Sequence, residues 1–406
     1  MSAAFSLDGT PGDAAKWRFV RRRAFAVFQA HGYVEVRPPS IEPLGVAERS
    51  GGEPAIAVEG GELRADPMAS IARLYVAAAS SPSDRFARWM LAGTVYDRSP
   101  RGAARARAWQ AVAGLILGAS DPAGDAEIAA LCGGVAADLG LVAPEVVIGS
   151  IGDAADLARY AAATAELGTL RCAACAGARD QLRFLSCEDE GCRALAASAP
   201  PLRASLGVAA LKHHEAVLAT LEASGFTVRD DPKLGFGAGR YNRTVVELRA
   251  RVAGARGEPG ELITVARGGR RDRLVESLGG RASAAVGVTL GVVRAAACTP
   301  GEGESYQPAC EVFFAARGSG GRAFALRAAA AERSRGFRVD VDLRPDKEAG
   351  WADQLMRAEK VRARVVVVVG DVERKRGEVA IRDMQTRETR TIPEDTLPAE
   401  LKRLLR

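Results

Sequence analysis

The chain has 406 residues, of which 48% are hydrophobic, 26% charged and 5% aromatic, and its net charge is +6. This length suits two or three domains, and the composition supplies a large core and excludes a disordered chain. No apolar run reaches the roughly 18 residues of a membrane span, and the first residues lack the apolar stretch of a secretory signal. Seven cysteines, an odd number in a long chain, argue against a disulfide framework. We therefore expect a cytoplasmic protein without a membrane partner.

The first 140 residues predict helices and strands in alternation. Apolar side chains at helical spacing predict a first helix, which Asp13 can cap and Gly32 can end. The apolar positions are Trp17, Val20, Ala24 and Val27. Alternation then predicts a strand at 33–37. Two apolar runs at 91–96 and 111–117 predict strands around an arginine-rich loop, and a helix is expected at 122–139.

The middle of the chain is expected to be helical between residues 150 and 225, where a cluster of cysteines also lies. Strands are predicted at 244–252 and 261–266, and residues 285–293 form an apolar run broken by glycine. Around residues 301–307 the composition becomes rich in glycine and polar residues, which indicates a linker.

The last 99 residues predict a small α/β domain with a mostly parallel sheet. Strands are expected at 312–315, 338–343 and 365–369, with helices at 322–335 and 351–361 between them. The run Val365–Val369 has no polar face, which is typical of a central strand covered on both sides. Residues 308–406 hold 21 Lys/Arg against 16 Asp/Glu, so they carry +5 of the net charge. A polyanion partner and an arginine-rich solvated surface explain this excess equally well.

Four cysteines in the helical segment have a spacing that suits a metal site. Cys172-x2-Cys175-x11-Cys187-x4-Cys192 can place four thiolates around a tetrahedral zinc ion. The alternative is a set of reduced, partly buried thiols in a helical insert, and the wide second pair favours it. The three histidines, His31, His213 and His214, are expected at the surface or at helix ends.

Taken in order, several segments resemble histidyl-tRNA synthetase, a class II aminoacyl-tRNA synthetase. GYVEVRPPSIE (32–42) is similar to the family's first motif, and LRADPMASIARLY (63–75) to its amino-acid-binding segment. Residues 96–118 match the second motif and its loop, and GASDPAGDAE (118–127) follows them. FGAGRYNRTVVE (236–247) and GGRRDRLVESLGG (268–280) correspond to the histidine-specific signatures, and AVGVTLGVVR (285–294) corresponds to the third motif.

The resemblance implies an α/β fold, with a class II antiparallel-sheet core over residues 1–300 and a helical, cysteine-containing insertion at about 150–225. A linker at 301–307 would join it to an anticodon-binding-like domain at 308–406. It also implies a homodimer through the first motif, around Gly32 to Pro39, and binding of tRNA or another RNA through residues 308–406.

The second motif departs from the family pattern where the ATP α-phosphate would bind. The family has an arginine and a glutamate where this chain has Asp97 and Ser99, so a carboxylate replaces the phosphate-binding guanidinium. The loop arginines Arg105 and Arg107, and Arg294 of the third motif, are retained as candidates to bind ATP.

The amino-acid site departs as well. Arg64, Asp66 and Tyr241 remain as candidates to bind the amino acid, while Met68 replaces a threonine. Leu115 stands where the family has the glutamate that holds the amino group, and Phe236 replaces a catalytic arginine. Removal of one preorganised donor typically costs about 10²–10³ in rate.

The leading hypothesis is therefore a catalytically degenerate relative with an RNA-binding or regulatory role. The first alternative is an active histidine–tRNA ligase that uses ATP and magnesium. The second is the regulatory subunit of ATP phosphoribosyltransferase, a related family that generally lacks the anticodon-binding domain.

Overall fold

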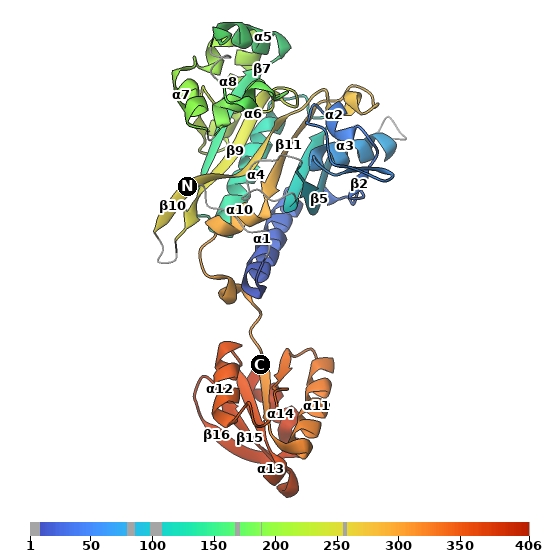
Figure 1. The fold of residues 1–406 in the computed structure, drawn as a ribbon, viewed down its shortest axis with the longest axis vertical. Helices are drawn as coiled ribbons and strands as arrows, with labels where there is room; N and C mark the ends of the chain where they lie inside the picture. Colours follow the sequence, from blue (N-terminus) through green and yellow to red (C-terminus); the bar gives the residue numbers. More distant parts are fainter. Residues whose placement is uncertain are drawn as a thin grey trace. The chain divides into compact units, whose positions relative to one another are not determined.

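A computed structural model describes residues 9–78, 86–97, 108–166, 171–187, 189–254 and 258–405. The chain divides into two compact units, residues 1–306 and residues 307–406 (Figure 1). Within the described ranges, no helix combines the length and the apolar character that crossing a lipid bilayer requires.

The first unit is built on an eight-stranded sheet, antiparallel except at its two ends, where β1 pairs with β5 and β8 with β7 in parallel. In spatial order the strands are β1 (Val34–Glu35), β5 (Ala87–Tyr96), β6 (Ala108–Leu117), β11 (Ala285–Gly291), β10 (Pro259–Arg270), β9 (Asn242–Ala253), β7 (Glu145–Gly152) and β8 (Arg229–Asp230). A small second sheet has the order β2 (Ile41–Glu42), β4 (Gly61–Leu63) and β3 (Ala57–Val58).

Helices cover both faces of the large sheet. Successive strand residues point to opposite sides, and both sides carry apolar side chains that need to be buried. On β6, Val112 and Ile116 belong to one core and Leu115 and Leu117 to the other. The first core is shared with α1 (Pro11–Ala30), α4 (Ala123–Leu139), α8 (Val208–Ala223) and α10 (Val292–Cys298). The second is shared with α2 (Val46–Arg49), α3 (Pro67–Ala78) and α9 (Leu274–Ser277).

The first helix forms as predicted but begins earlier than expected. Thr10, not Asp13, is the N-cap residue: its hydroxyl accepts from the Asp13 backbone N–H at 3.3 Å, and the Asp13 carboxylate accepts from the Thr10 N–H at 3.0 Å. Pro11 suits the first helical position because its fixed φ fits a helix and no N–H is needed there. Gly32 follows the helix with φ +80°, as predicted.

The helical insertion gathers around β7 at one end of the sheet (Figure 1). It contains α5 (Ala154–Ala163), α6 (Ala173–Ala176), η2 (Arg183–Ser186), α7 (Glu190–Ser198), η3 (Leu202–Ser205) and α8. The strand β7 that precedes it was not predicted, because Gly149 and Gly152 interrupt its apolar pattern.

The segment before residue 307 is partly folded onto the first unit. The short helix η4 (Gly303–Tyr306) lies against α1, where the rings of Phe19 and Tyr306 are 4.7 Å apart between centroids. Lys16 Nζ donates a hydrogen bond to the Gly301 carbonyl at 2.8 Å.

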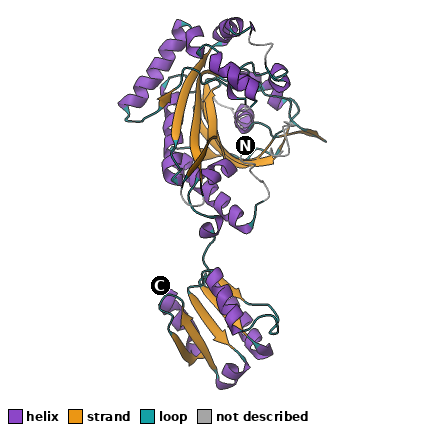
Figure 2. Cartoon of the chain, turned by 60° about the vertical axis from the view of Figure 1, so that its left-hand side comes forward, coloured by secondary structure: helices purple, strands orange, loops and turns teal. Residues whose placement is uncertain are grey.

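The second unit has a five-stranded sheet with helices on both faces (Figure 2). Its order is β13 (Val339–Val341), β12 (Val312–Ala316), β14 (Val365–Val369), β15 (Glu378–Asp383) and β16 (Thr389–Pro393). Its helices are α11 (Gly318–Ser334), α12 (Trp351–Lys360), α13 (Asp371–Arg376), η5 (Glu394–Thr396) and α14 (Leu397–Leu405).

The expectation of a mostly parallel sheet in this unit was wrong. The first three strands are parallel, but β15 and β16 are antiparallel to their neighbours. The helix α13 between β14 and β15 has only six residues and returns the chain antiparallel to β14, and a turn joins β15 to β16. The valine strand is central and covered on both sides, as predicted: Val365 and Val367 face one core and Val366 the other.

Candidate active site

The side chains predicted to bind the amino acid come from several segments that meet on the α3 face of the large sheet. Asp66 directly precedes α3, and Leu115 lies on β6. Phe236 and Tyr241 precede β9, and Arg271 follows the last residue of β10. The fold therefore brings together residues that are far apart in sequence.

The carboxylate of Asp66 is buried and its oxygens accept hydrogen bonds from within the protein. Oδ1 accepts from the backbone N–H groups of Met68 at 3.0 Å and Ala69 at 3.2 Å, so Asp66 caps the N-terminus of α3. Oδ2 accepts from Arg271 Nη1 at 2.7 Å. This carboxylate is thus committed to the fold and already paired with a cation.

Arg271 is the partner that sequence reasoning did not identify. Its side chain is buried, and Nη2 donates to the Ser50 carbonyl at 2.9 Å, while its guanidinium carbon lies 5.6 Å from the centre of the Tyr241 ring. Burial alone would raise the pKa of Asp66, but the nearby charges of Arg271 and Arg240 and the hydrogen bonds hold it below its usual value. No local signal marks this pair, which is separated by 205 positions.

The position where the resemblance expects a substrate-binding glutamate is filled by hydrocarbon. Leu115 is fully buried and Met68 is 3% exposed, and both belong to the same apolar core. They converge on Gly287 of β11: a Cβ at that glycine would lie 2.9 Å from Leu115 Cδ1 and 2.9 Å from Met68 Sδ. A leucine here cannot hold an ammonium group, and its neighbours have closed around it.

Phe236 is also buried, and an arginine lies over its ring. The guanidinium carbon of Arg267 is 4.9 Å from the ring centre, and the Tyr241 ring meets Phe236 edge-on at 5.5 Å between centroids. Arg267 Nε donates to one oxygen of the buried Glu247 at 2.6 Å, and Arg249 Nε donates to the other at 2.6 Å. Burial would raise the pKa of Glu247, but these two arginines hold it below its usual range.

The remaining candidates are dispersed or lie outside the described residues. Arg64 is buried and donates to the carbonyls of Pro38 at 2.8 Å and Thr94 at 3.3 Å, so its guanidinium supports the backbone. Arg294 is exposed on α10, and its Nε donates to the Thr264 carbonyl. Asp97 follows the last residue of β5 and is partly exposed. Ser99, Arg105 and Arg107 lie outside the described residues.

On the opposite face of the sheet, Arg270 forms a second buried ion pair. Its Nε lies 3.1 Å from both carboxylate oxygens of Asp125 on α4, and its Nη1 donates to Asp272 at 3.1 Å. His213 Nε2 lies 3.3 Å from Asp125 Oδ2. Burial would lower the pKa of Arg270, but Asp125 and Asp272 raise it above its usual value.

The predicted surface location was wrong for two of the three histidines. His213 and His214 lie within α8 and are 7% and 3% exposed, because each faces a carboxylate: Asp125 and Asp230, respectively. His31 is at the C-cap of α1, as expected.

The four insertion cysteines lie close together. The sulfur atoms of Cys172, Cys175, Cys187 and Cys192 are all within 4.8 Å of one another. Cys132, Cys298 and Cys310 are buried elsewhere as free thiols, and burial raises the pKa of both Cys132 and Cys298 to about 12.

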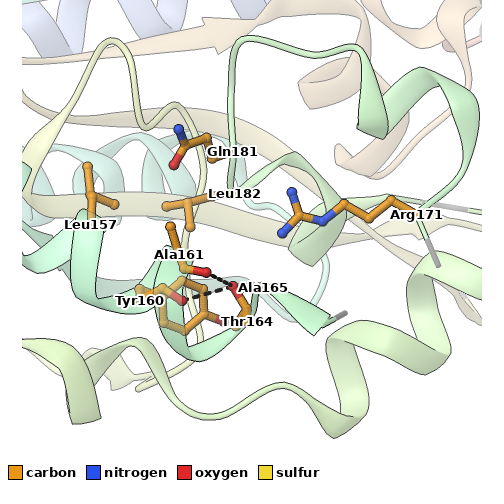
Figure 3. Close-up of a pocket in the computed structure, with 8 residues that line it drawn as sticks. All are labelled: Leu157, Tyr160, Ala161, Thr164, Ala165, Arg171, Gln181 and Leu182. Atoms are coloured by element: carbon orange, nitrogen blue, oxygen red, sulfur yellow. Dashed lines mark hydrogen bonds between the residues drawn. The ribbon is translucent and has the colours of Figure 1, made fainter. Parts of the chain in front are cut away.

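A pocket of about 300 Å³ opens in the same insertion (Figure 3). Tyr160, Thr164 and Leu182 contribute to its wall, and Arg171 is the one charged residue among the described residues that line it. The Thr164 hydroxyl donates to the Tyr160 carbonyl at 2.8 Å. Among the described candidates, Arg64, Asp66, Tyr241 and Arg294 do not line this pocket.

The Asp66–Arg271 pair generates a stability prediction. Arg271→Met should lower the free energy of unfolding at pH 7 by about 3 kcal/mol, because loss of one partner strands a buried charge. Since the pKa of Asp66 is lowered in the fold, the pair stabilises above the unfolded pKa of about 4, and this contribution disappears as pH falls through the folded value. The difference between wild type and variant should therefore narrow in acid, as measured by urea denaturation with tryptophan fluorescence.

The matched control is Arg273→Met, two positions along, because Arg273 is exposed. It should change stability by no more than about 0.5 kcal/mol. An equally small effect of Arg271→Met would mean that Asp66 is not committed to this pair.

Comparisons with known proteins match each of the two units. A family model described as histidyl-tRNA synthetase matches residues 7–230, and a model described as an anticodon binding domain matches residues 320–404. The chain is 32% identical over 421 residues to a histidine–tRNA ligase of Anaeromyxobacter sp. strain K, with 97% of each chain covered. It is 30% identical over 415 residues to that of Desulfosudis oleivorans, covering 97% of this chain and 96% of the relative.

Solved structures show the same fold. Apo histidyl-tRNA synthetase of S. aureus superposes with a TM-score of 0.73 at 22% identity and 99% coverage of both chains. An ATP phosphoribosyltransferase regulatory subunit/histidyl-tRNA synthetase from Bacillus halodurans gives a TM-score of 0.64 at 18% identity, covering 91% of this chain and 98% of that one. The predicted class II core and C-terminal anticodon-binding domain are thereby confirmed. The chain belongs to the histidyl-tRNA synthetase family.

Proposed function

We propose that this chain is a cytoplasmic member of its family that has lost amino-acid activation and keeps a role in binding tRNA or another RNA. The observation that carries the proposal is the state of the amino-acid site. Its carboxylate, Asp66, is tied to Arg271 and to the backbone of α3, and Met68 and Leu115 occupy the adjacent space. A substrate ammonium group would have to displace Arg271 to reach Asp66.

The residues described around the site also fit ATP and magnesium poorly. Formation of an adenylate needs cations at the α-phosphate, and Asp97 supplies a carboxylate at that position of the motif. The buried Glu247 already accepts hydrogen bonds from two guanidiniums, so it has little capacity left for a metal ion. We therefore propose no ATP-dependent step for this chain.

An active histidine–tRNA ligase is the competing function, because the ligases of Anaeromyxobacter and Desulfosudis match the chain over nearly its full length. The regulatory role in the histidine pathway has weaker support. That hypothesis needs a histidine-sensing pocket, and the saturated Asp66 and buried Leu115 oppose it.

Purified protein should show no histidine-dependent ATP–pyrophosphate exchange above background. The histidine–tRNA ligase of Anaeromyxobacter sp. strain K, assayed in parallel, is the matched positive control. Isothermal titration should likewise detect no histidine binding. This measurement distinguishes a pocket that cannot bind histidine from one that binds it but catalyses activation slowly. Exchange at a rate near that of the control enzyme would establish the ligase and reject the degenerate interpretation.

The second unit supplies the basis for RNA binding. Its net charge is +5, and many of its arginines are paired with carboxylates. Arg322 with Asp346 and Arg364 with Asp383 are examples. Arg374 pairs with Glu394 and lies 4.7 Å from the centre of the Phe324 ring, which makes it structural. Its neighbours Lys375 and Arg376 are exposed, with no ion-pair partner among the described residues.

Full-length protein should bind tRNA with an affinity that falls steeply as salt is raised, because phosphate contacts release counterions. The double variant Lys375→Gln/Arg376→Gln should reduce the slope of log K against log salt by about 2 if both residues contact phosphates. Arg21→Gln/Arg22→Gln, an equal charge change on the exposed face of α1, is the control and should alter the slope less. Absence of tRNA binding even in low salt would point to a protein partner instead.

We also propose a homodimer through the first-motif surface. The strand β1 lies at one edge of the large sheet, and the segment around it exposes apolar side chains: Val34 is 63% and Leu44 67% exposed. Pro39 is exposed between them. A symmetric dimer would cover this patch on both chains.

Light scattering at micromolar concentration should give the mass of a dimer for wild type and of a monomer for Val34→Lys/Leu44→Lys. The control Val208→Lys places one lysine on a residue of α8 that is 70% exposed, and it should leave the dimer intact. A monomeric wild type would reject this interface.

A further inference from the structure

The four cysteines of the helical insertion converge although they belong to different short elements. Cys172 is the N-cap of α6 and Cys175 lies within it, Cys187 follows η2, and Cys192 lies in the first turn of α7. Three separate segments therefore place their sulfur atoms at the same point: two from α6, one from the residue after η2 and one from α7.

The spacing of the sulfur atoms fits a tetrahedral metal site. A zinc ion with Zn–S bonds of about 2.3 Å places its four sulfurs about 3.8 Å apart. Here Cys172 Sγ and Cys187 Sγ are 3.9 Å apart, and the whole set lies within 4.8 Å. The four ligand atoms are thus already close to the arrangement that the ion requires.

The surrounding backbone supports thiolate ligands. The Cys172 N–H points at Cys192 Sγ with an N–S distance of 3.3 Å, a contact that stabilises negative charge on sulfur. The side chain of Asp189 accepts from the Cys192 N–H at 3.1 Å and fixes the start of α7. Such outer contacts orient the ligands before the ion arrives.

The insertion also has the kind of core that a metal ion would reinforce. Cys175 and Cys192 are 3% and 0% exposed and pack with Phe184 and Leu195 in a small apolar cluster. The elements that carry the ligands are only four to nine residues long, so they have little stability of their own. Cys132, Cys298 and Cys310 are also buried, but among the described residues they belong to no group of three or more possible metal ligands.

We propose that Cys172, Cys175, Cys187 and Cys192 bind one zinc ion that staples the helical insertion. Binding converts the thiols to thiolates and releases their protons to solvent, with no change of oxidation state. Because the protein fills all four positions, the site has no place for a substrate and is structural. The proposal stands whether or not the chain activates histidine.

Metal analysis of full-length protein, purified under reducing conditions without chelator, should give about one zinc per chain. Cys172→Ser/Cys187→Ser should lose it, whereas the control Cys310→Ser, a buried cysteine of the second unit, should keep it. Removal of the ion with a chelator should make residues 150–225 more sensitive to limited proteolysis, and added zinc should reverse this. Retention of zinc by the double variant, or no zinc in wild type even after reconstitution, would overturn the proposal.

A second measurement on the unaltered chain covers the case in which the double variant fails to fold. Apoprotein titrated with cobalt(II) should develop the visible absorption of a tetrahedral thiolate complex and saturate at one equivalent, and zinc should displace the cobalt. In parallel, a thiol reagent should modify four more cysteines in the apoprotein than in the zinc form. A cobalt spectrum of octahedral type, or disulfides among these four cysteines in reduced protein, would reject the tetrathiolate site.

Discussion

Two consecutive buried arginines at the end of β10 organise the first unit. Because neighbouring residues of a strand point to opposite faces, Arg270 reaches Asp125 on α4 and Arg271 reaches Asp66 before α3. Each cation thereby fastens a helix to its own side of the sheet. A buried ion pair is sensitive to the loss of either partner, so both helices depend on this short stretch of backbone.

The pair of Asp66 and Arg271 also supports the proposed loss of amino-acid activation. A carboxylate that binds a substrate ammonium group needs an oxygen that can accept a hydrogen bond from it. Both oxygens of Asp66 already accept hydrogen bonds, from Arg271 and from the backbone of α3. Leu115 and Met68 pack beside it in one apolar cluster. The fold of the family is present, and both side chains are part of its apolar core.

Much of the fold could be predicted from sequence because it rests on local signals. Helical spacing located α1, and the unbroken valine run identified β14 as a central strand. The strand β7 was missed because glycines interrupt it, and the β15–β16 meander was missed because a parallel pattern was extended past its end. The amino-acid site was predicted as a set of altered motif residues, but its decisive contact joins Asp66 to Arg271 across 205 positions. A single sequence gives no means of pairing such distant charges.

The arginine that lies over Phe236 limits which side chains position 236 can accept. Arg267 uses the aromatic ring as a platform and is neutralised by Glu247, which also holds Arg249. An arginine introduced at position 236 would meet the Arg267 guanidinium, and both oxygens of Glu247 already accept a hydrogen bond from an arginine. The single substitution Phe236→Arg would therefore place two guanidiniums side by side in a buried position. It would have to be accompanied by a change at Arg267 or Arg249.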